Sequence, residues 1–295
     1  MNIFKNAFKI VGAKFPIVWS IILYYLIAGV IITSVGLSIL LPYVNALVDF
    51  KVTEAVLQIL KDLSRGEFSV FFTGAHSLWK ELVGGLQPHR FEASLLLLAV
   101  FMIGRFLFGW ADLAFYDMIH LHLSSAAKLG FMPCFIKRIG PAALYQLNKL
   151  VFSLPFDIAV FAVLYLISLL TAVAALVIFV PFIMMLAAVL LFSLRIAFLS
   201  GWAPALLEHQ KSVSASFGIS VKRLRGNFRR DYVVYLLFFL AAIVFNVFFG
   251  LFTLLVGLVL TIPLTLFFLK VLNCVVFRQN SGLRYYIDKD NVVNG

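Results

Sequence analysis

The sequence predicts an all-α membrane protein: a polytopic helical bundle of six transmembrane helices, forming one domain over residues 1–295. Two observations predict this fold. Six long apolar stretches lie between Lys14 and Lys270, and lysine and arginine gather in alternate gaps between them. Hydrophobic residues make up 63% of the chain and charged residues 13%, against roughly 25% charged in an ordinary soluble domain. Each polar residue must therefore be judged against the bilayer as solvent.

The six spans follow from length. A helix needs about 20 apolar residues to cross the hydrocarbon core. The expected spans are 15–42, 93–117, 150–171, 174–202, 232–250 and 253–277. After Lys14 the apolar run continues to Val48, longer than the roughly 7–15 residues of a signal-peptide core, so the first span is expected to remain as an anchor.

Charge sets the orientation of these spans. Three segments carry an excess of lysine and arginine: 1–14, 120–149 and 205–231. With six spans these segments lie on one face, which the positive-inside rule identifies as the cytoplasm. Both termini, including a tail over 278–295, are therefore expected on the cytoplasmic side. The same rule accounts for the net charge of +11 without a nucleic-acid partner.

The segment 49–92, which carries six acids and five bases, is predicted to be the outer loop. Apolar residues recur at helical spacing between Val52 and Leu63, and a second apolar-rich piece runs from Phe68 to Leu86. Both pieces are expected to be amphipathic elements on the outer membrane surface. A ligand-binding lid is the less favoured alternative.

The basic segments resemble one another. Each contains a predicted amphipathic helix before a span: Ile3–Val11, Leu123–Ile139 and Val213–Leu224. The glycines that follow them are separated by 128 and 86 residues, and the excess of 42 is close to the length of the outer loop. This spacing predicts three repeats, each an interfacial helix followed by a transmembrane hairpin. Because residue identity between the units is weak, coincidence of a generic pattern remains an alternative.

Four ionisable residues are expected inside spans: Arg105, Asp112, Asp157 and Arg195. Charges at such depth are costly, so they are normally paired or exposed to a water-filled cavity. Arg105 and Asp112 are seven residues apart and would share one face of a continuous helix. Since the four charges sum to zero, we expect one polar cluster, with Asp157 and Arg195 as its pair. The favoured interpretation is a lock between helices; the alternative is a cavity for a lipid head group or a translocated solute.

Basic residues close the predicted interfacial helices. Val213–Leu224 has one apolar stripe with charges at its end, as expected of a helix half-sunk among lipid phosphates. Contacts with inner-leaflet lipid are predicted for Lys137, Arg138, Lys222, Arg223, Arg225, Arg229 and Arg230. Orientation alone would also select these charges, so this pattern does not by itself establish lipid binding.

Catalytic motifs are absent from the sequence: it has no H-E-x-x-H motif, Walker loop or nucleophile elbow. Cys134 and Cys274 fall on the predicted cytoplasmic side and lack metal-ligand spacing. No cofactor and no metal site are therefore predicted.

Residues 195–231 carry a resemblance to a known family. Arg195 ends a span, Ala203-Pro204 follows, and Glu208 precedes an amphipathic helix that closes as Ser220-Val221-Lys222-Arg223-Leu224-Arg225-Gly226-Asn227-Phe228. This pattern is similar to the YciC-like group of bacterial multipass inner-membrane proteins, which includes the membrane domain of some glycerophosphoryl diester phosphodiesterases. The resemblance covers residues 195–295 best. It implies a helical module of the bacterial inner membrane, often without catalytic residues. The outer loop departs from the pattern, and the sequence has no phosphodiesterase barrel.

The expected function is that of a non-enzymatic inner-membrane module that interacts with membrane phospholipids or scaffolds other membrane proteins. The alternative is a small transporter or flippase-like permease that uses the intramembrane charges.

Overall fold

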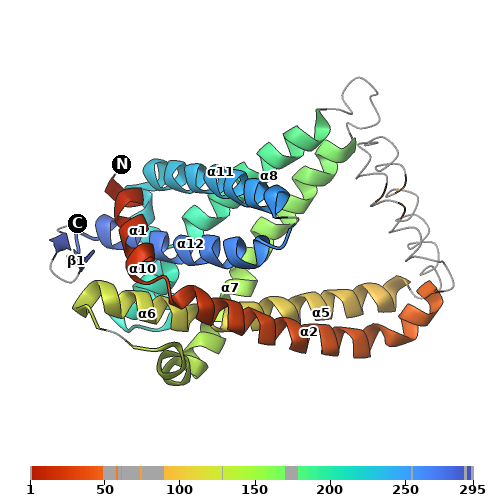
Figure 1. Ribbon diagram of the computed structural model, residues 1–295, viewed down its shortest axis with the longest axis horizontal. Helices are drawn as coiled ribbons and strands as arrows, with labels where there is room; N and C mark the ends of the chain where they lie inside the picture. Colours follow the sequence, from red (N-terminus) through yellow and green to blue (C-terminus); the bar gives the residue numbers. More distant parts are fainter. Residues whose placement is uncertain are drawn as a thin grey trace. The chain divides into compact units, whose positions relative to one another are not determined.

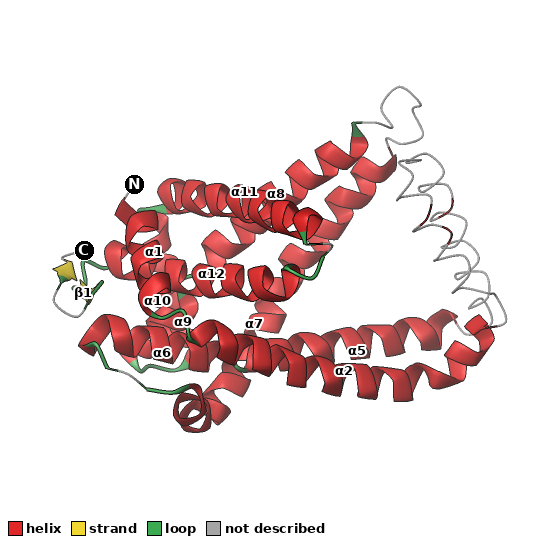
Figure 2. Ribbon diagram, viewed as in Figure 1, coloured by secondary structure: helices red, strands yellow, loops and turns green. Residues whose placement is uncertain are grey.

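The computed structural model describes residues 2–48, 58, 61, 74, 90–127, 129–169, 179–253, 255–288 and 291–293. Figures 1 and 2 show that these residues are almost all helical. The helices are α1 (Asn2–Ala13), α2 (Ile17–Val48), α5 (Arg90–Trp110), α6 (Asp112–Ser125), α7 (Phe131–Ser168), α8 (Val180–Leu199), α9 (Trp202–His209), α10 (Val213–Arg225), α11 (Phe228–Phe252) and α12 (Leu258–Asn280). Within the same residues, β1 (Tyr285–Tyr286) pairs with β2 (Val292–Val293) in an antiparallel ladder.

The described residues contain six helical stretches long and apolar enough to cross a membrane. This confirms the all-α polytopic fold. They are Ile17–Ile39, Leu95–Ser125, Phe131–Ile167, Phe182–His209, Phe228–Phe252 and Leu258–Asn280.

The chain divides into two compact units. The smaller unit, Leu26–Leu107, contains most of α2 and α5. These helices approach closely at two glycines: a methyl group added to Gly36 would lie 3.4 Å from Val100, and one added to Gly104 would lie 3.5 Å from Ile32. The larger unit contains Met1–Tyr25 and Phe108–Gly295, and therefore all the other helices.

The core of the larger unit is concentrated at one end of its spans. We call this the basic end; it consists of α1, α6, α9, α10 and the C-terminal half of α12. Ile10, Phe115, Trp202 and Val275 are fully buried there. The most apolar part of α12 is 61% buried, against 17–22% in the other five spans, so α12 is the central helix. The remaining spans expose apolar side chains, as helices facing lipid do.

Two of the three predicted amphipathic helices, Ile3–Val11 and Val213–Leu224, are confirmed as helices α1 and α10. Helix α10 begins after Ser212, whose hydroxyl accepts from the Ala215 N–H at 3.4 Å and caps the helix. Helix α1 packs against α12, as Figure 1 shows, where Phe4 and Phe268 stack with their ring centroids 6.5 Å apart.

The predicted helix Leu123–Ile139 is wrong. Helix α6 ends at Ser125, because Ala126 takes a left-handed φ of 53°. Helix α7 then runs unbroken to Ser168 and includes Pro141 and Pro155. The expected end at Ile139 is missing because Pro141 lies inside α7, and a proline inside a span is tolerated when neighbouring groups satisfy the freed carbonyls.

The spans expected at 232–250 and 253–277 require a turn near Gly250–Gly257, and this turn is confirmed. Helix α11 ends at Phe252, and the Gly257 N–H donates to the Thr253 hydroxyl at 2.7 Å just before α12 begins. The predicted turn at Thr171–Ala174 lies outside the described residues. So do the amphipathic elements expected in segment 49–92, apart from three single helical residues.

The predicted tail, 278–295, begins within α12, and its described residues 281–288 and 291–293 are folded against the basic end. Tyr285 is 1% exposed, and its hydroxyl accepts a hydrogen bond from Asn6 Nδ2 of α1 at 2.6 Å. Burial raises the pKa of this hydroxyl, so it stays protonated. Lys9 also lies 3.6 Å from Asp288. The C-terminal strands therefore hold α1 in place.

Candidate functional site

The first element of the site is a buried carboxylate between two lysines. Asp112 opens α6 and is 8% exposed. Its Oδ2 accepts from Lys149 Nζ of α7 at 2.7 Å, and its Oδ1 accepts from Lys270 of α12. Next to this cluster, Asn273 Nδ2 donates to the Tyr116 hydroxyl at 2.6 Å. Three helices are thus joined through one side chain.

Asp157 and Arg195 form the predicted pair. Arg195 Nε of α8 lies 3.3 Å from Asp157 Oδ1 of α7. Asp157 and Lys149 both belong to α7, where eight positions, or about 12 Å along the helix, separate this pair from the Asp112 cluster. The prediction that Asp157 and Arg195 pair is therefore confirmed.

The cluster differs from the neutral group of four that the sequence predicted. The helix is interrupted at Ala111, between α5 and α6, so Arg105 and Asp112 do not lie on one continuous helix. Arg105 belongs to the smaller unit, where its guanidinium lies 5.8 Å from the centre of the Phe101 ring. The sequence pattern places Lys149 in the basic segment 120–149, outside the spans. It gives no indication that Lys270, inside the last span, belongs to the cluster. Three cations, Lys149, Lys270 and Arg195, therefore pair with the two carboxylates of Asp112 and Asp157.

A second charged group lies where α6, α9 and α12 meet. Glu208 of α9 accepts from Arg278 of α12 at 2.6 Å and lies 3.5 Å from His120 of α6. Arg278 is 4% exposed and also donates to the Arg284 carbonyl at 2.8 Å, which ties α12 to the tail. Glu208, which belongs to the sequence pattern that carries the family resemblance, thus links α6, α9 and α12 inside the protein.

Two Gly-Trp-Ala tripeptides mark the breaks in the spans, a signal that the sequence analysis missed. Gly109-Trp110-Ala111 separates α5 from α6, and Gly201-Trp202-Ala203 separates α8 from α9. The Trp110 indole donates to the Ile139 carbonyl at 3.0 Å, and the Trp202 indole donates to the Val213 carbonyl at 2.8 Å. Trp110 therefore attaches the end of α5 to α7, and Trp202 attaches the start of α9 to the start of α10.

The seven basic residues predicted to contact lipid divide into two groups. Arg138 binds Asp117 at 3.2 Å. Arg223 lies 4.7 Å from the Phe277 ring centre and 3.0 Å from His209; its partial burial lowers the pKa of the guanidinium. The exposed residues are Lys137, Lys222, Arg225, Arg229 and Arg230.

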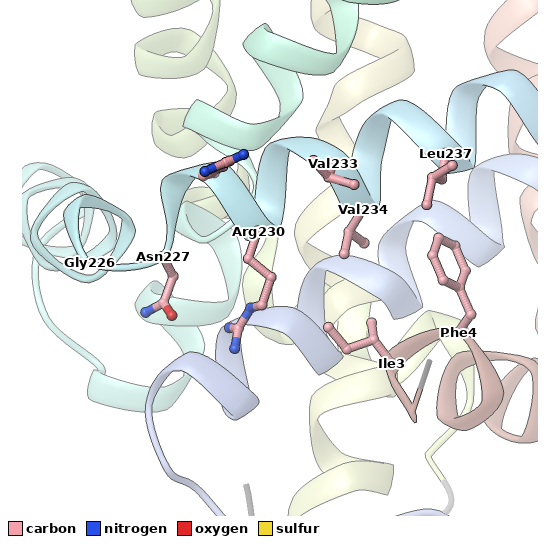
Figure 3. A pocket seen from close by; sticks show the side chains of 9 residues that line it. Ile3, Phe4, Gly226, Asn227, Arg230, Val233, Val234 and Leu237 are labelled. Atoms are coloured by element: carbon pink, nitrogen blue, oxygen red, sulfur yellow. The ribbon is translucent and has the colours of Figure 1, made fainter.

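A groove of about 820 Å³ lies between α1 and the start of α11 (Figure 3). This volume falls within the roughly 300–1,000 Å³ typical of ligand pockets. Ile3 and Phe4 of α1 line one side. In Figure 3, Phe4 faces Leu237 at the apolar end, while Arg230 lies at the other. The remaining lining residues are Gly226, Asn227, Arg229, Val233 and Val234.

No family model, curated protein or solved structure matches this chain. The resemblance to the YciC-like group therefore stays a prediction, and the function must be argued from the geometry of the chain itself.

Proposed function

We propose that this protein is a non-enzymatic module of the bacterial inner membrane that gathers anionic phospholipids at the cytoplasmic leaflet. One observation carries the proposal: exposed basic side chains surround the end of the bundle where the core is packed. Lys137, Lys222 and Arg225 extend from α7 and α10 into solvent rather than into the protein. Each basic residue close to an anionic surface contributes about 1 kcal/mol to membrane attraction.

The shape of the larger unit supports this proposal. Its packed core lies at the basic end, while the spans present apolar side chains such as Phe161 and Val247, which are 69% and 54% exposed. A bundle of this form occupies the bilayer with its apolar spans and places its folded end among the head groups. The repeated Gly-Trp-Ala tripeptide, which occurs near the end of the second span in the first two of the three predicted units, supports the predicted internal repeat. The same folded end offers a surface for scaffolding partner membrane proteins.

The test is the lipid composition around the protein. The protein is extracted from bacterial membranes in polymer-bounded native discs, and the lipids are quantified by mass spectrometry. We expect the wild type to be enriched in anionic lipids relative to the whole membrane. Replacing Lys137, Lys222 and Arg225 with Gln should reduce this enrichment.

The matched control replaces three lysines of the predicted outer loop, Lys51, Lys61 and Lys80, with Gln. It removes the same charge and should keep the enrichment. If the wild-type discs have the composition of the whole membrane, or if both triple variants behave alike, the proposal is wrong.

The alternative is a small permease or flippase-like carrier. The excess cation among Asp112, Lys149, Lys270, Asp157 and Arg195 favours it, because an anion could balance that charge. This alternative predicts anion flux into proteoliposomes that is lost when Lys270 is changed to Met. Anion-impermeable proteoliposomes containing folded protein would exclude it.

A further inference from the structure

We propose that the groove between α1 and α11 is a specific site for one anionic glycerophospholipid. In this proposal the phosphate binds at Arg229 and Arg230, and the upper part of an acyl chain lies along Val233 and Leu237. The inference rests on the proposed function. It goes further because it assigns lipid binding to one site, whereas the proposed function requires only a basic surface.

The polar end of the groove suits a phosphate. Arg230 is anchored by the Asn280 side-chain oxygen and lies 3.5 Å from Asp231, while its side chain remains 45% exposed. The Asp231 carboxylate is 1% exposed and accepts from Asn280 Nδ2 at 2.6 Å, so it is engaged inside the protein. Arg229 is exposed and lines the same end. Each of these two arginines carries a guanidinium, whose forked donors bind phosphate well.

The start of α11 adds to this attraction. Asn227 is the N-cap residue, and its side chain makes no capping hydrogen bond. The first-turn N–H groups of a helix carry partial positive charge and bind anions. Gly226 and Asn227 line the groove at this point, so the helix start and the two arginines act on the same end.

The apolar end identifies the ligand as a lipid rather than a free phosphate. Leu237 is eight residues beyond Arg229, which at 1.5 Å per residue is about 12 Å farther along α11. Val233 and Leu237 are 44% and 52% exposed, and Phe4 faces Leu237 from α1. Phe4 is held by stacking on Phe268, which itself stacks on Phe238 at 5.7 Å. A charged end and an apolar end in this order match a phospholipid entering from the leaflet.

The test is native mass spectrometry of the full-length protein in detergent, titrated with phosphatidylglycerol, phosphatidylcholine or inorganic phosphate. We expect one phosphatidylglycerol adduct to form at least tenfold more tightly than phosphatidylcholine, with inorganic phosphate failing to displace it. Changing Arg229 and Arg230 to Gln should weaken phosphatidylglycerol binding about tenfold. The matched control, K211Q with R284Q, removes two exposed charges outside the groove lining and should bind within twofold of wild type.

A second pair of variants tests the apolar end. Leu237→Trp fills the groove and should abolish the adduct, whereas Leu240→Trp, at a 41% exposed position of the same helix outside the groove lining, should preserve it. Displacement by inorganic phosphate would show an anion site without a lipid, and equal binding by both tryptophan variants would show no groove site. Either result overturns this inference. Anionic enrichment in native discs without a discrete adduct would also overturn it, while leaving the proposed function intact.

Discussion

At the residue scale, the buried charges of this protein are shared between helices. Asp112 binds cations from α7 and α12, Asp157 binds one from α8, and Glu208 binds Arg278 from α12. Removing one partner of a buried pair leaves the other charge uncompensated, which costs more than the pair itself contributes. These residues should therefore dominate the effect of single polar substitutions on stability.

The first prediction concerns Asp112. Asp112→Asn should lower the free energy of unfolding by about 3 kcal/mol, because Lys149 and Lys270 then lie close together without a carboxylate. Thermal unfolding in detergent measures the loss. Asp288→Asn is the matched control: Asp288 and its partner Lys9 are 43% and 47% exposed, so it should change stability by about 0–1 kcal/mol. Equal melting temperatures for the two variants would contradict this account of the cluster.

The sequence was sufficient to predict the Asp157–Arg195 pair, because both residues lie deep in consecutive spans. It was insufficient for Lys149 and Lys270. Lys149 lies just before the expected span 150–171, in a basic segment where lysine is ordinary, and Asp112, the partner of Lys270, is 158 positions away in sequence. Hydrophobic patterning gives the depth of a residue but not which helices are neighbours. That information requires the packing of α6, α7 and α12.

At the element scale, apolar composition determines the length of each span, whereas local contacts determine where the helix of a span is interrupted. Helix α7 continues through Pro141, at which the sequence predicted an end. The spans break instead at Gly-Trp-Ala, where the glycine allows close approach. A methyl group on Gly201 would lie 2.5 Å from Ser220 Oγ and 3.4 Å from the Phe277 ring. Composition could not reveal this contact, because it joins α10 and α12 to the break.

The second prediction follows from that close approach. Gly201→Ala should destabilise the protein by about 1–3 kcal/mol, because the added methyl group overpacks a buried position. Gly218→Ala, in α10, adds the same group where no atom lies within 4 Å, and it should be neutral or stabilising by up to about 1 kcal/mol. Thermal unfolding of the two variants makes the comparison. Destabilisation by Gly218→Ala as large as that by Gly201→Ala would refute the packing argument.

The third prediction concerns the attachment of α1 by the tail. Tyr285→Ala removes a buried ring and the hydrogen bond with Asn6, so backbone amides of α1 should exchange with deuterium faster. Tyr285→Phe keeps the ring and loses only the hydrogen bond, so its effect should be smaller. Hydrogen exchange read by mass spectrometry separates these cases. Unchanged exchange in α1 for Tyr285→Ala would show that the tail does not hold this helix.

At the scale of the whole molecule, six helices are long and apolar enough to cross a membrane, and an even number of crossings predicts that the two ends of the chain lie on the same side. The charge pattern of the connecting segments sets which side this is. These features were accessible from the sequence, because each depends on composition over many residues rather than on a particular contact. The concentration of the core at the basic end was not accessible, since all six spans are similarly apolar and α12 alone reaches 61% burial among them.

The fourth prediction tests this topology by cysteine labelling in intact cells. Lys61→Cys should react with a membrane-impermeant maleimide added outside. Lys5→Cys and Arg284→Cys should react after the membrane is permeabilised. The native Cys134 and Cys274 are 1% and 3% exposed, so the background should be low. Labelling of the Lys5 and Arg284 variants from opposite sides, or of the Lys61 variant from the cytoplasm, would contradict the six-span topology.

The packing of α1 against α12 has a consequence for biosynthesis. Phe4 leaves the ribosome 264 residues before Phe268, its stacking partner. At about 5–20 residues per second, the nascent helix waits roughly 13–50 s for that partner. During this interval α1 has apolar residues, including Ala7 and Ile10, that are not yet buried by the protein and must be kept from water in another way. An amphipathic helix can bury its apolar face by lying on the bilayer surface, so we expect α1 to stay bound to lipid until the final span inserts.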